Sequence, residues 1–244
     1  MNIDVIGSIG EARSDELLHK TVIVIDVLRA TTTMVAALAN GATGVLPAET
    51  VLQAREQQTG AEVLGGERYC KKIPDFDLGN SPADYTAQAV GGRRVILTTT
   101  NGTRGIHKAQ KAEHVLAGAL VNATSCAAAA VSLKRDVVII CAGTQDVFAL
   151  EDGLCAGLLV DSLLATARSS DATPNVNDFG LAMRACYLQE RHRLLDALLG
   201  CANGKRLCKL GFRSDVDFCA QVDSTALVPM LRSHVMVPFT APQF

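Results

Sequence analysis

The sequence predicts an α/β protein in which a mainly parallel or mixed sheet lies between two layers of helices. Short, continuous apolar runs recur along the chain, and each ends in small or polar residues; the clearest are residues 22–26, 94–98 and 136–141. Such a run is typical of a strand that is buried on both faces. Segments of helical character separate these runs over about 140 residues. This alternation predicts parallel strands with helices on both faces of the sheet.

The first predicted unit contains a strand, a loop and a helix. Val22 to Asp26 form the strand, which places an acid at its carboxyl end. Thr31 to Thr33 can cap the following helix, and the Asn40-Gly41 pair can end it.

Weaker elements continue the alternation. Ser81, Pro82 and Asp84 favour a helix start, because serine can cap a helix and proline suits its first position. The further expected elements are strands at 44–47, 61–64, 94–98, 114–117 and 136–141, helices at 50–59, from 81, at 104–111, 122–133, 153–166 and 178–199, and a loop at 69–80.

The composition is that of an ordinary globular protein. The chain has 244 residues, of which 48% are hydrophobic and 20% charged. A chain of this length buries roughly 70–75% of its unfolded surface, so we expect one domain over residues 1–244. The polar stretch 168–177 leaves room for two α/β subdomains with a hinge there.

The composition also disfavours nucleic-acid binding and membrane insertion. The net charge is −2, the aromatic share is 4%, and lysine and arginine form no run. Residues 115–133 carry no charge, but Asn122, Thr124 and Ser125 interrupt them, which predicts a strand, a turn and a buried helix. The N-terminus lacks the basic-then-apolar order of a signal peptide. We therefore expect a cytoplasmic protein; a homodimer remains open.

The eight cysteines are scattered, and no pair forms C-x-x-C. This arrangement gives no support to a zinc site and favours free thiols in a reducing compartment.

The densest polar segment follows the strand at 94–98. Residues 98–104 are Thr-Thr-Thr-Asn-Gly-Thr-Arg. Hydroxyl, backbone N–H and guanidinium groups all donate hydrogen bonds, and a helix that begins near Thr103 would add the positive end of its dipole. The segment therefore indicates a site for a tetrahedral anion. The alternative is a polar strand-to-helix turn with a good cap.

A second candidate site combines Asp26 with Arg29. A strand-end carboxylate can hold a divalent ion or attack phosphorus, and the arginine can neutralise developing charge. The alternative is a capping acid in a surface salt bridge. A similar choice between metal ligand and solvated charge applies to acids elsewhere: Glu67, Asp75, Asp77, Glu151 and Asp152.

Several common catalytic motifs are missing from the sequence. There is no C-x5-R, no histidine pair at i and i+4, and no P-loop. The remaining candidate site residues are mainly carboxylates, threonines and arginines. That set predicts magnesium chemistry on a small anionic phosphate ester.

Five segments together resemble the 2-phosphosulfolactate phosphatase family. They are VIVIDVLRATTTMVAALANGA, GERYCKKIPDFDLGNSPADY, VILTTTNGTR, CAGTQDVFALEDGLCAG, and SDVDFCAQVD followed by VP, and they span almost the whole chain in order. The resemblance implies a family-specific α/β fold and an Mg²⁺-dependent enzyme that hydrolyses 2-phosphosulfolactate in coenzyme M synthesis. Two residues depart from family usage, since Cys70 and Asp146 stand where the family has glycine.

The resemblance also implies the site residues. The catalytic set is Asp26, Arg29 and Glu67, and the metal set is Asp26, Glu67, Glu151 and Asp152. Arg29, Arg68 and Arg104 are assigned to the phosphate and the sulfonate. The substrate-binding set is Thr31, Arg68, Asn80, Ser81, Thr98, Thr99, Thr100, Asn101, Gly102, Thr103, Arg104 and Gly143.

Water is the expected nucleophile, with direct attack by Asp26 as the rival. Two other functions fit the same residues. One is a non-catalytic protein that binds a small anion, and the other is a phosphatase of a different small acidic phosphoester.

Overall fold

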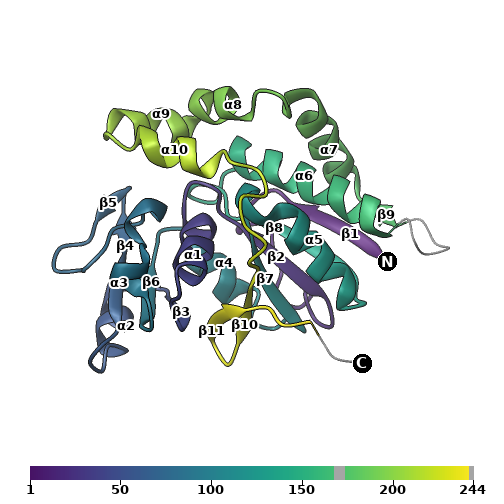
Figure 1. Ribbon diagram of the computed structural model, residues 1–244. Coiled ribbons are helices and arrows are strands. Elements are labelled where there is room, and N and C mark those ends of the chain that lie inside the picture. Colours follow the sequence, from purple (N-terminus) through teal and green to yellow (C-terminus); the bar gives the residue numbers. More distant parts are fainter. Residues whose placement is uncertain (168–173, 242–244) are drawn as a thin grey trace.

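A computed structural model describes residues 1–167 and 174–241 of the chain. The described strands form one mixed sheet of eleven, in the order β5-β4-β6-β3-β11-β10-β7-β2-β8-β1-β9. Helices lie on both sides of this sheet (Figure 1). The predicted α/β architecture is thereby confirmed.

The larger part of the sheet is parallel. It contains β7 (His114–Gly118), β2 (Thr21–Ile25), β8 (Val137–Cys141), β1 (Asn2–Ile6) and β9 (Asn175–Val176). All residues of β2 are buried. Ile23 and Ile25 belong to one core cluster, whereas Val22 and Val24 belong to another. This strand is therefore buried on both faces, as its continuous apolar run predicted.

The smaller part is also mainly parallel. It contains β3 (Gly44–Ala48), β6 (Arg94–Thr98) and β4 (Val63–Arg68), while the short β5 (Lys71–Lys72) pairs antiparallel with β4. Helices α2 (Val51–Glu56) and α3 (Ala87–Val90) accompany this part.

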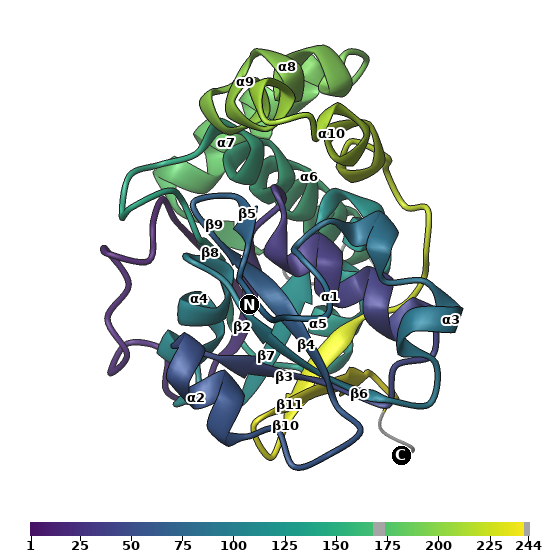
Figure 2. The ribbon, with the colours of Figure 1, turned by 90° about the vertical axis from the view of Figure 1, so that its left-hand side faces the viewer.

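An antiparallel hairpin joins the two parts. Its strands are β10 (Pro229–Arg232) and β11 (Val235–Pro238). Met230 lies opposite Leu116 of β7, and Met236 lies opposite Val45 of β3. The direction of the chain reverses at each of these three pairings, so the two parallel groups do not share one direction. The sheet is strongly twisted (Figure 2).

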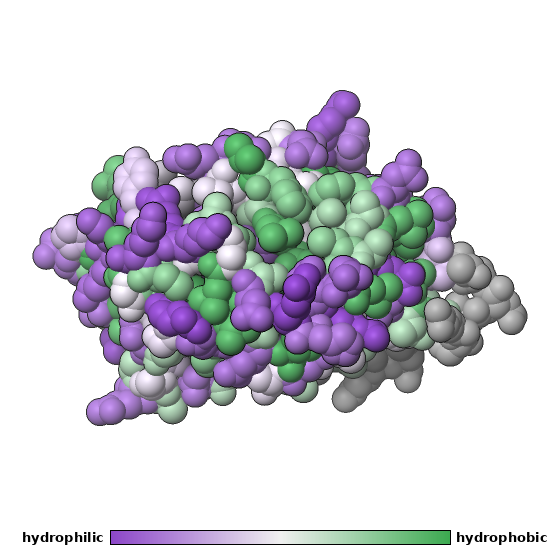
Figure 3. Space-filling view, turned by 90° about the horizontal axis from the view of Figure 1, so that it is seen from above, coloured by the Kyte–Doolittle hydropathy of each residue, from purple (hydrophilic) through white to green (hydrophobic). Residues whose placement is uncertain are grey.

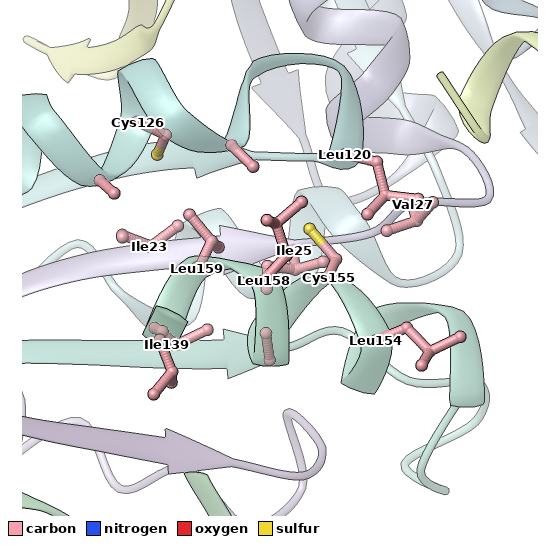
Figure 4. Packing of buried hydrophobic residues seen from close by; sticks show 14 of the residues in the cluster. Ile23, Ile25, Val27, Leu120, Cys126, Ile139, Leu154, Cys155, Leu158 and Leu159 are labelled. Carbon is pink, nitrogen blue, oxygen red and sulfur yellow. The ribbon is translucent and has the colours of Figure 1, made fainter. Parts of the chain in front are cut away.

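Four helices cover the two faces of the larger part. Helices α1 (Ala30–Ala39) and α4 (Gly102–Lys108) contribute to the cluster that contains Val22. Helices α5 (Ala123–Ser132) and α6 (Leu150–Ala167) contribute to the cluster that contains Ile23. Figure 4 shows side chains of α5 and α6, including Cys126 and Leu159, packed against Ile23 and Ile139 of the sheet.

A layer of C-terminal helices covers α6 and extends toward β5 (Figures 1 and 2). It consists of α7 (Asp178–Glu190), α8 (Leu194–Gly200), α9 (Ala202–Lys209) and α10 (Arg213–Cys219). Leu198, Leu207 and Val216 of this layer are buried in the same cluster as Ile23. Its outer face carries both hydrophilic and hydrophobic residues (Figure 3). The layer is thus part of the core and brings α9 and α10 above the strand ends.

Several boundaries differ from the predictions. Helix α6 begins at Leu150 instead of 153, and β4 continues to Arg68. The helix predicted from 81 is a 3-10 turn at Pro82–Asp84 followed by α3, and residues 178–199 form two helices. Strands β1, β5, β9, β10 and β11 were not predicted, and β5 lies within the stretch 69–80 that was expected to be a loop.

Residues 115–133 form β7, a 3-10 turn at Leu120–Asn122 and α5, as expected. Among the described residues, no helix has the length and apolar character needed to span a membrane. Residues 168–173 of the suggested hinge lie outside the described residues, and all eight cysteines are free thiols.

Candidate active site

A cleft lies where loops after several strands meet the C-terminal helices. The loop after β2 contributes Asp26 and Arg29, and the loops after β6 and β8 contribute Thr100 and Thr144. The structure thus brings together the segments that follow three of the predicted strands. The complete lining is Asp26, Leu28, Arg29, Glu67, Tyr69, Cys70, Asn80, Thr100, Asn101, Thr144, Gln145, Asn203 and Arg206.

Asp26 is a buried carboxylate directly after the end of β2, with 8% of its surface exposed. Its Oδ1 accepts a hydrogen bond from Ala30 N–H at 3.1 Å. Burial raises the pKa of Asp26 to about 7, and the nearby charges of Glu67 and Glu151 add to the rise. This carboxyl can therefore exchange a proton near neutral pH.

Thr31 fixes the turn that carries Asp26. Its hydroxyl accepts from Asp26 N–H and donates to Asp26 O, both at 2.9 Å. Thr31 is fully buried and does not line the cleft. The structure thus places it behind the site, as a support for Asp26.

Glu67 ties β4 to the loop after β6. Its Oε1 accepts from the N–H and the hydroxyl of Thr100 at 2.8 and 2.9 Å, and its Oε2 accepts from Cys70 N–H at 2.7 Å. The neighbouring Arg68 points elsewhere and donates to Glu67 O, Glu49 O and Thr98 Oγ1. Glu67 therefore lines the cleft, whereas Arg68 does not.

Some residues of the threonine-rich segment 98–104 stabilise its turn, and others line the cleft. Thr99 Oγ1 accepts from Thr103 N–H at 3.1 Å, and Thr103 Oγ1 accepts from Thr99 N–H at 3.2 Å. These bonds, like that from Arg68 to Thr98, stabilise the strand-to-helix turn. Only Thr100 and Asn101 of this segment line the cleft.

Gly102 of this segment lies against Asp26. A Cβ atom at Gly102 would lie 2.7 Å from Asp26 Oδ2, so glycine allows α4 to approach the carboxylate.

Arg104 is 43% exposed and pairs with Asp146 Oδ1 at 3.3 Å. It lines a separate surface groove with Glu49 and Lys108. The structure does not bring Arg104 into the cleft with Asp26.

Glu151 and Asp152 lie in the first turn of α6, beneath the cleft, and each is 2% exposed. Asp152 accepts from Val27 N–H and from Gly143 N–H, both at 2.9 Å, and so connects the loops after β2 and β8. Burial, together with the charges of Glu151 and Asp26, raises the pKa of Asp152 well above its usual range. These acids and Gly143 support the cleft without lining it.

Asn80 and Ser81 are consecutive in the sequence, but only Asn80 lines the cleft. Asn80 lines the cleft, and its Oδ1 is buried without a hydrogen-bond partner. Ser81 donates its hydroxyl hydrogen bond to Asp215 Oδ1 at 2.8 Å instead. Asp215 also accepts from Arg29, which places α10 against the cleft arginine.

Sequence reasoning missed the contributions of the turn after β4 and of α9. Tyr69 and Cys70 form that turn, and Asn203 and Arg206 come from α9. Asn203 Nδ2 donates to Thr144 Oγ1 at 2.7 Å and to Glu151 Oε1 at 2.6 Å. The spacing of Asn203 and Arg206, three residues apart, was an available signal, because such residues share one face of a helix.

The two departures from family usage share one conformation. Cys70 has φ +66° and Asp146 has φ +61°, both in the left-handed region that favours glycine. Burial raises the pKa of the Cys70 thiol, which keeps it protonated at neutral pH and argues against a cysteine nucleophile.

The carboxylates that line the cleft can bind a divalent cation. Asp26 and Glu67 line the cleft above Glu151 and Asp152, and none of these four forms an ion pair with a cation of the described residues. The described residues contain no group of three or more acidic, histidine or cysteine side chains arranged to hold a metal, so Asp26, Glu67 and Asp152 do not surround one point. Mg²⁺ is usually bound through one or two carboxylates together with water and phosphate oxygens, and Asp26 with Glu67 fits that pattern.

Comparison with known proteins identifies the family. The family model described as 2-phosphosulpholactate phosphatase matches residues 9–234. The chain belongs to this family. A probable 2-phosphosulfolactate phosphatase of Symbiobacterium thermophilum is 40% identical over 228 residues, which cover 92% of this chain and 96% of that protein. The family assignment makes the chain a phosphatase, a hydrolase of phosphoric monoesters.

Clostridial relatives carry the same name. The probable 2-phosphosulfolactate phosphatase of Clostridium tetani is 34% identical over 239 residues, which cover 97% of this chain and all (100%) of that protein. The protein so named from Clostridium novyi is 36% identical over 233 residues, with 94% and 96% covered. The likeness therefore extends over the β-sheet, the cleft and the C-terminal helices.

Proposed function

We propose that this enzyme hydrolyses 2-phosphosulfolactate to sulfolactate and inorganic phosphate with Mg²⁺, as a step of coenzyme M synthesis. Family membership and the names of the relatives support the reaction and the substrate. The structural observation that carries the proposal is Asp26, a buried strand-end carboxylate that faces a cleft with two guanidinium groups, those of Arg29 and Arg206.

The charges of the cleft support a role for a divalent cation. Five carboxylates lie in or against the cleft, whereas Arg29 and Arg206 are the cations that line it. A phosphate ester that also carries a carboxylate and a sulfonate would be repelled by this excess of negative charge. Asp26 and Glu67 would hold Mg²⁺, which when bound neutralises phosphate charge and acts as a Lewis acid.

Asp26 is the residue best placed to handle a proton. In the proposed reaction a water oxygen forms a bond to phosphorus and the ester P–O bond breaks. The leaving sulfolactate oxygen takes a proton from solvent, and the proton that Asp26 removes from the attacking water returns to solvent. Asp26 accepts a proton from the attacking water; in the metal-free protein its pKa is about 7. Ala30 N–H orients the carboxylate for this task. Direct attack by Asp26 on phosphorus is the rival route.

The remaining residues position the substrate and Asp26. Thr100 and Asn101 present polar groups to the cleft beside Glu67, and Asp152 fixes the loop that carries Asp26 through its bond to Val27 N–H. Arg29 supplies a guanidinium group at the wall of the cleft for the phosphate.

Phosphate release from synthetic 2-phosphosulfolactate tests the proposal. We expect turnover with Mg²⁺ and loss of turnover with EDTA, restored by excess Mg²⁺. A panel of other small phosphate esters should be hydrolysed more slowly. Turnover that is insensitive to EDTA would remove the metal from the proposal, and binding of the ester without phosphate release would contradict the assigned activity. Mass spectrometry after a rapid acid quench separates the two routes, because only direct attack forms a phosphorylated Asp26 as an intermediate.

A further inference from the structure

Two arginines from distant parts of the chain bind the same turn of the cleft. Arg29 Nη2 donates to Cys70 O at 3.3 Å, and Arg206 Nη2 donates to Tyr69 O at 3.4 Å. Tyr69 and Cys70 have φ values of +55° and +66°. This left-handed turn therefore offers consecutive carbonyl groups to the two guanidinium groups. Both arginines also line the cleft.

The two arginines differ in how their charge is balanced. Arg29 is buried, and its guanidinium is paired with the Asp215 carboxylate. Arg206 lies at the exposed rim, and no acidic side chain of the described residues forms an ion pair with it. The Nη2 of Arg206 donates to a carbonyl oxygen, and a guanidinium has further N–H groups that can bind a ligand. Arg206 thus contributes a positive charge that an anionic ligand can balance.

Helix α9 holds Arg206 in a defined place. Asn203, one turn earlier, donates to Thr144 on the opposite wall and to the buried Glu151. Leu207, next to Arg206, is buried in the main core cluster. Because both contacts fix α9 above the cleft, the reach of the Arg206 side chain is limited to the rim.

We propose that Arg206 binds the sulfonate of the substrate and makes the enzyme selective for phosphoesters that carry this second strong anion. The inference rests on the proposed function. Hydrolysis requires the phosphate to lie near Asp26 at the base of the cleft, whereas Arg206 lies at the rim. In 2-phosphosulfolactate the sulfonate is one carbon further from the ester carbon than the carboxylate is. It is therefore the anionic group that reaches the rim, where the guanidinium fork can bind its oxygens.

Three esters and two variants test this assignment. The esters are 2-phosphosulfolactate, 2-phospholactate, which lacks the sulfonate, and 2-sulfoethyl phosphate, which lacks the carboxylate. The variants are Arg206→Gln and, as control, Lys205→Gln, which removes the same charge from an exposed neighbour outside the cleft. Values of kcat and KM are measured for each pair, and melting temperatures show that both variants fold.

Arg206→Gln should lower kcat/KM for the two sulfonated esters about 10- to 100-fold, mainly through KM, because a charge-assisted hydrogen bond is lost. Hydrolysis of 2-phospholactate should change less than about 2-fold, and Lys205→Gln should leave the three esters equally unaffected. Equal losses on all three esters would place Arg206 at the phosphate instead, and no loss on any would remove it from substrate binding.

A binding measurement separates this inference from the proposed function. If the wild-type enzyme hydrolyses none of the esters, the proposed function fails, but calorimetry can still compare sulfolactate with lactate. Tighter binding of sulfolactate to the wild type, with the difference lost in Arg206→Gln, would support the sulfonate site. Equal affinity of the wild type for both acids would overturn it.

Discussion

Arg29 and Asp215 form a buried ion pair although 186 positions separate them in the sequence. Arg29 lies in the loop after β2, and Asp215 lies in α10, the last helix of the C-terminal layer. Ser81 donates to the other carboxylate oxygen at 2.8 Å, and the guanidinium carbon lies 4.6 Å from the centre of the Phe212 ring. The C-terminal helices therefore hold a cleft arginine in place and are part of the site.

Asp215→Asn tests the importance of this pair. The change leaves Arg29 charged and buried without its partner, which should lower the free energy of unfolding by about 3–5 kcal/mol. Urea unfolding measures the loss. The matched control is Asp217→Asn, which removes an exposed pair with Arg213 on the same helix and should cost about 0–1 kcal/mol. Equal stability of the two variants would contradict the structural role of Asp215.

Asp26→Asn should separate catalysis from folding. The amide oxygen can still accept from Ala30 N–H, and a buried charge is removed, so the melting temperature should stay equal or rise. The rate constant kcat should fall by about 10²–10⁴-fold, since the variant cannot accept a proton. Asp75→Asn is the control, because Asp75 is an exposed loop acid with φ +64°, which asparagine tolerates. A collapse of the melting temperature in Asp26→Asn would instead mark Asp26 as structural.

The stability of the metal-free protein should depend on pH through Asp26. Its pKa is about 7 in the folded state, above the value of about 3.9 expected in the unfolded chain. The stabilisation from this raised pKa is fully present below about pH 4 and is lost as the pH rises through about 7. Unfolding in EDTA should therefore be easier at pH 8 than at pH 5.5, by a difference on the order of 1–2 kcal/mol from this group.

Mg²⁺ should reverse this trend. A cation that binds ionised Asp26 stabilises the folded state more at pH 8 than at pH 5.5. Asp26→Asn serves as the control and should make both pH profiles less steep; the buried Asp152, whose pKa is also raised, keeps its own contribution. A wild-type protein whose EDTA and Mg²⁺ profiles coincide at pH 8 would argue against metal binding at Asp26.

Arg104→Lys should have little effect on catalysis. Arg104 is an exposed partner of Asp146 in a groove outside the cleft, so the substitution should change kcat/KM less than about 2-fold. Steady-state kinetics on 2-phosphosulfolactate measure the effect. A tenfold rise in KM would show that Arg104 binds the phosphate, as the sequence had suggested.

The sequence predicted the elements whose signal is local. The strand predicted at 22–26 is observed at Thr21–Ile25, because these five consecutive residues suit burial on both faces. Asn40 ends α1 as expected. The start of α6 was misplaced because Glu151 and Asp152 were taken for loop acids, although acids in a first turn complement the helix dipole. The β10–β11 hairpin was missed, since its strands are short and pair with β7 and β3, far away in the sequence.

Sequence reasoning predicted the cleft residues only where they lie at or directly after the end of a strand. Asp26 and Glu67 each lie at the carboxyl end of a strand and line the cleft as expected, although β2 and β4 belong to parallel groups of opposite direction. Arg104 is close to Thr100 in sequence, but the direction of α4 turns its side chain toward Asp146. Arg206 was missed because only the packing of α9 over the cleft brings it to the turn at Tyr69.

A crystal structure of the enzyme with Mg²⁺ and sulfolactate would show where the metal and the product bind. We expect the metal in contact with a carboxylate oxygen of Asp26 or Glu67 and the sulfonate against Arg206, in one cleft. A metal bound elsewhere, or sulfolactate seated in the groove beside Arg104, would contradict this expectation.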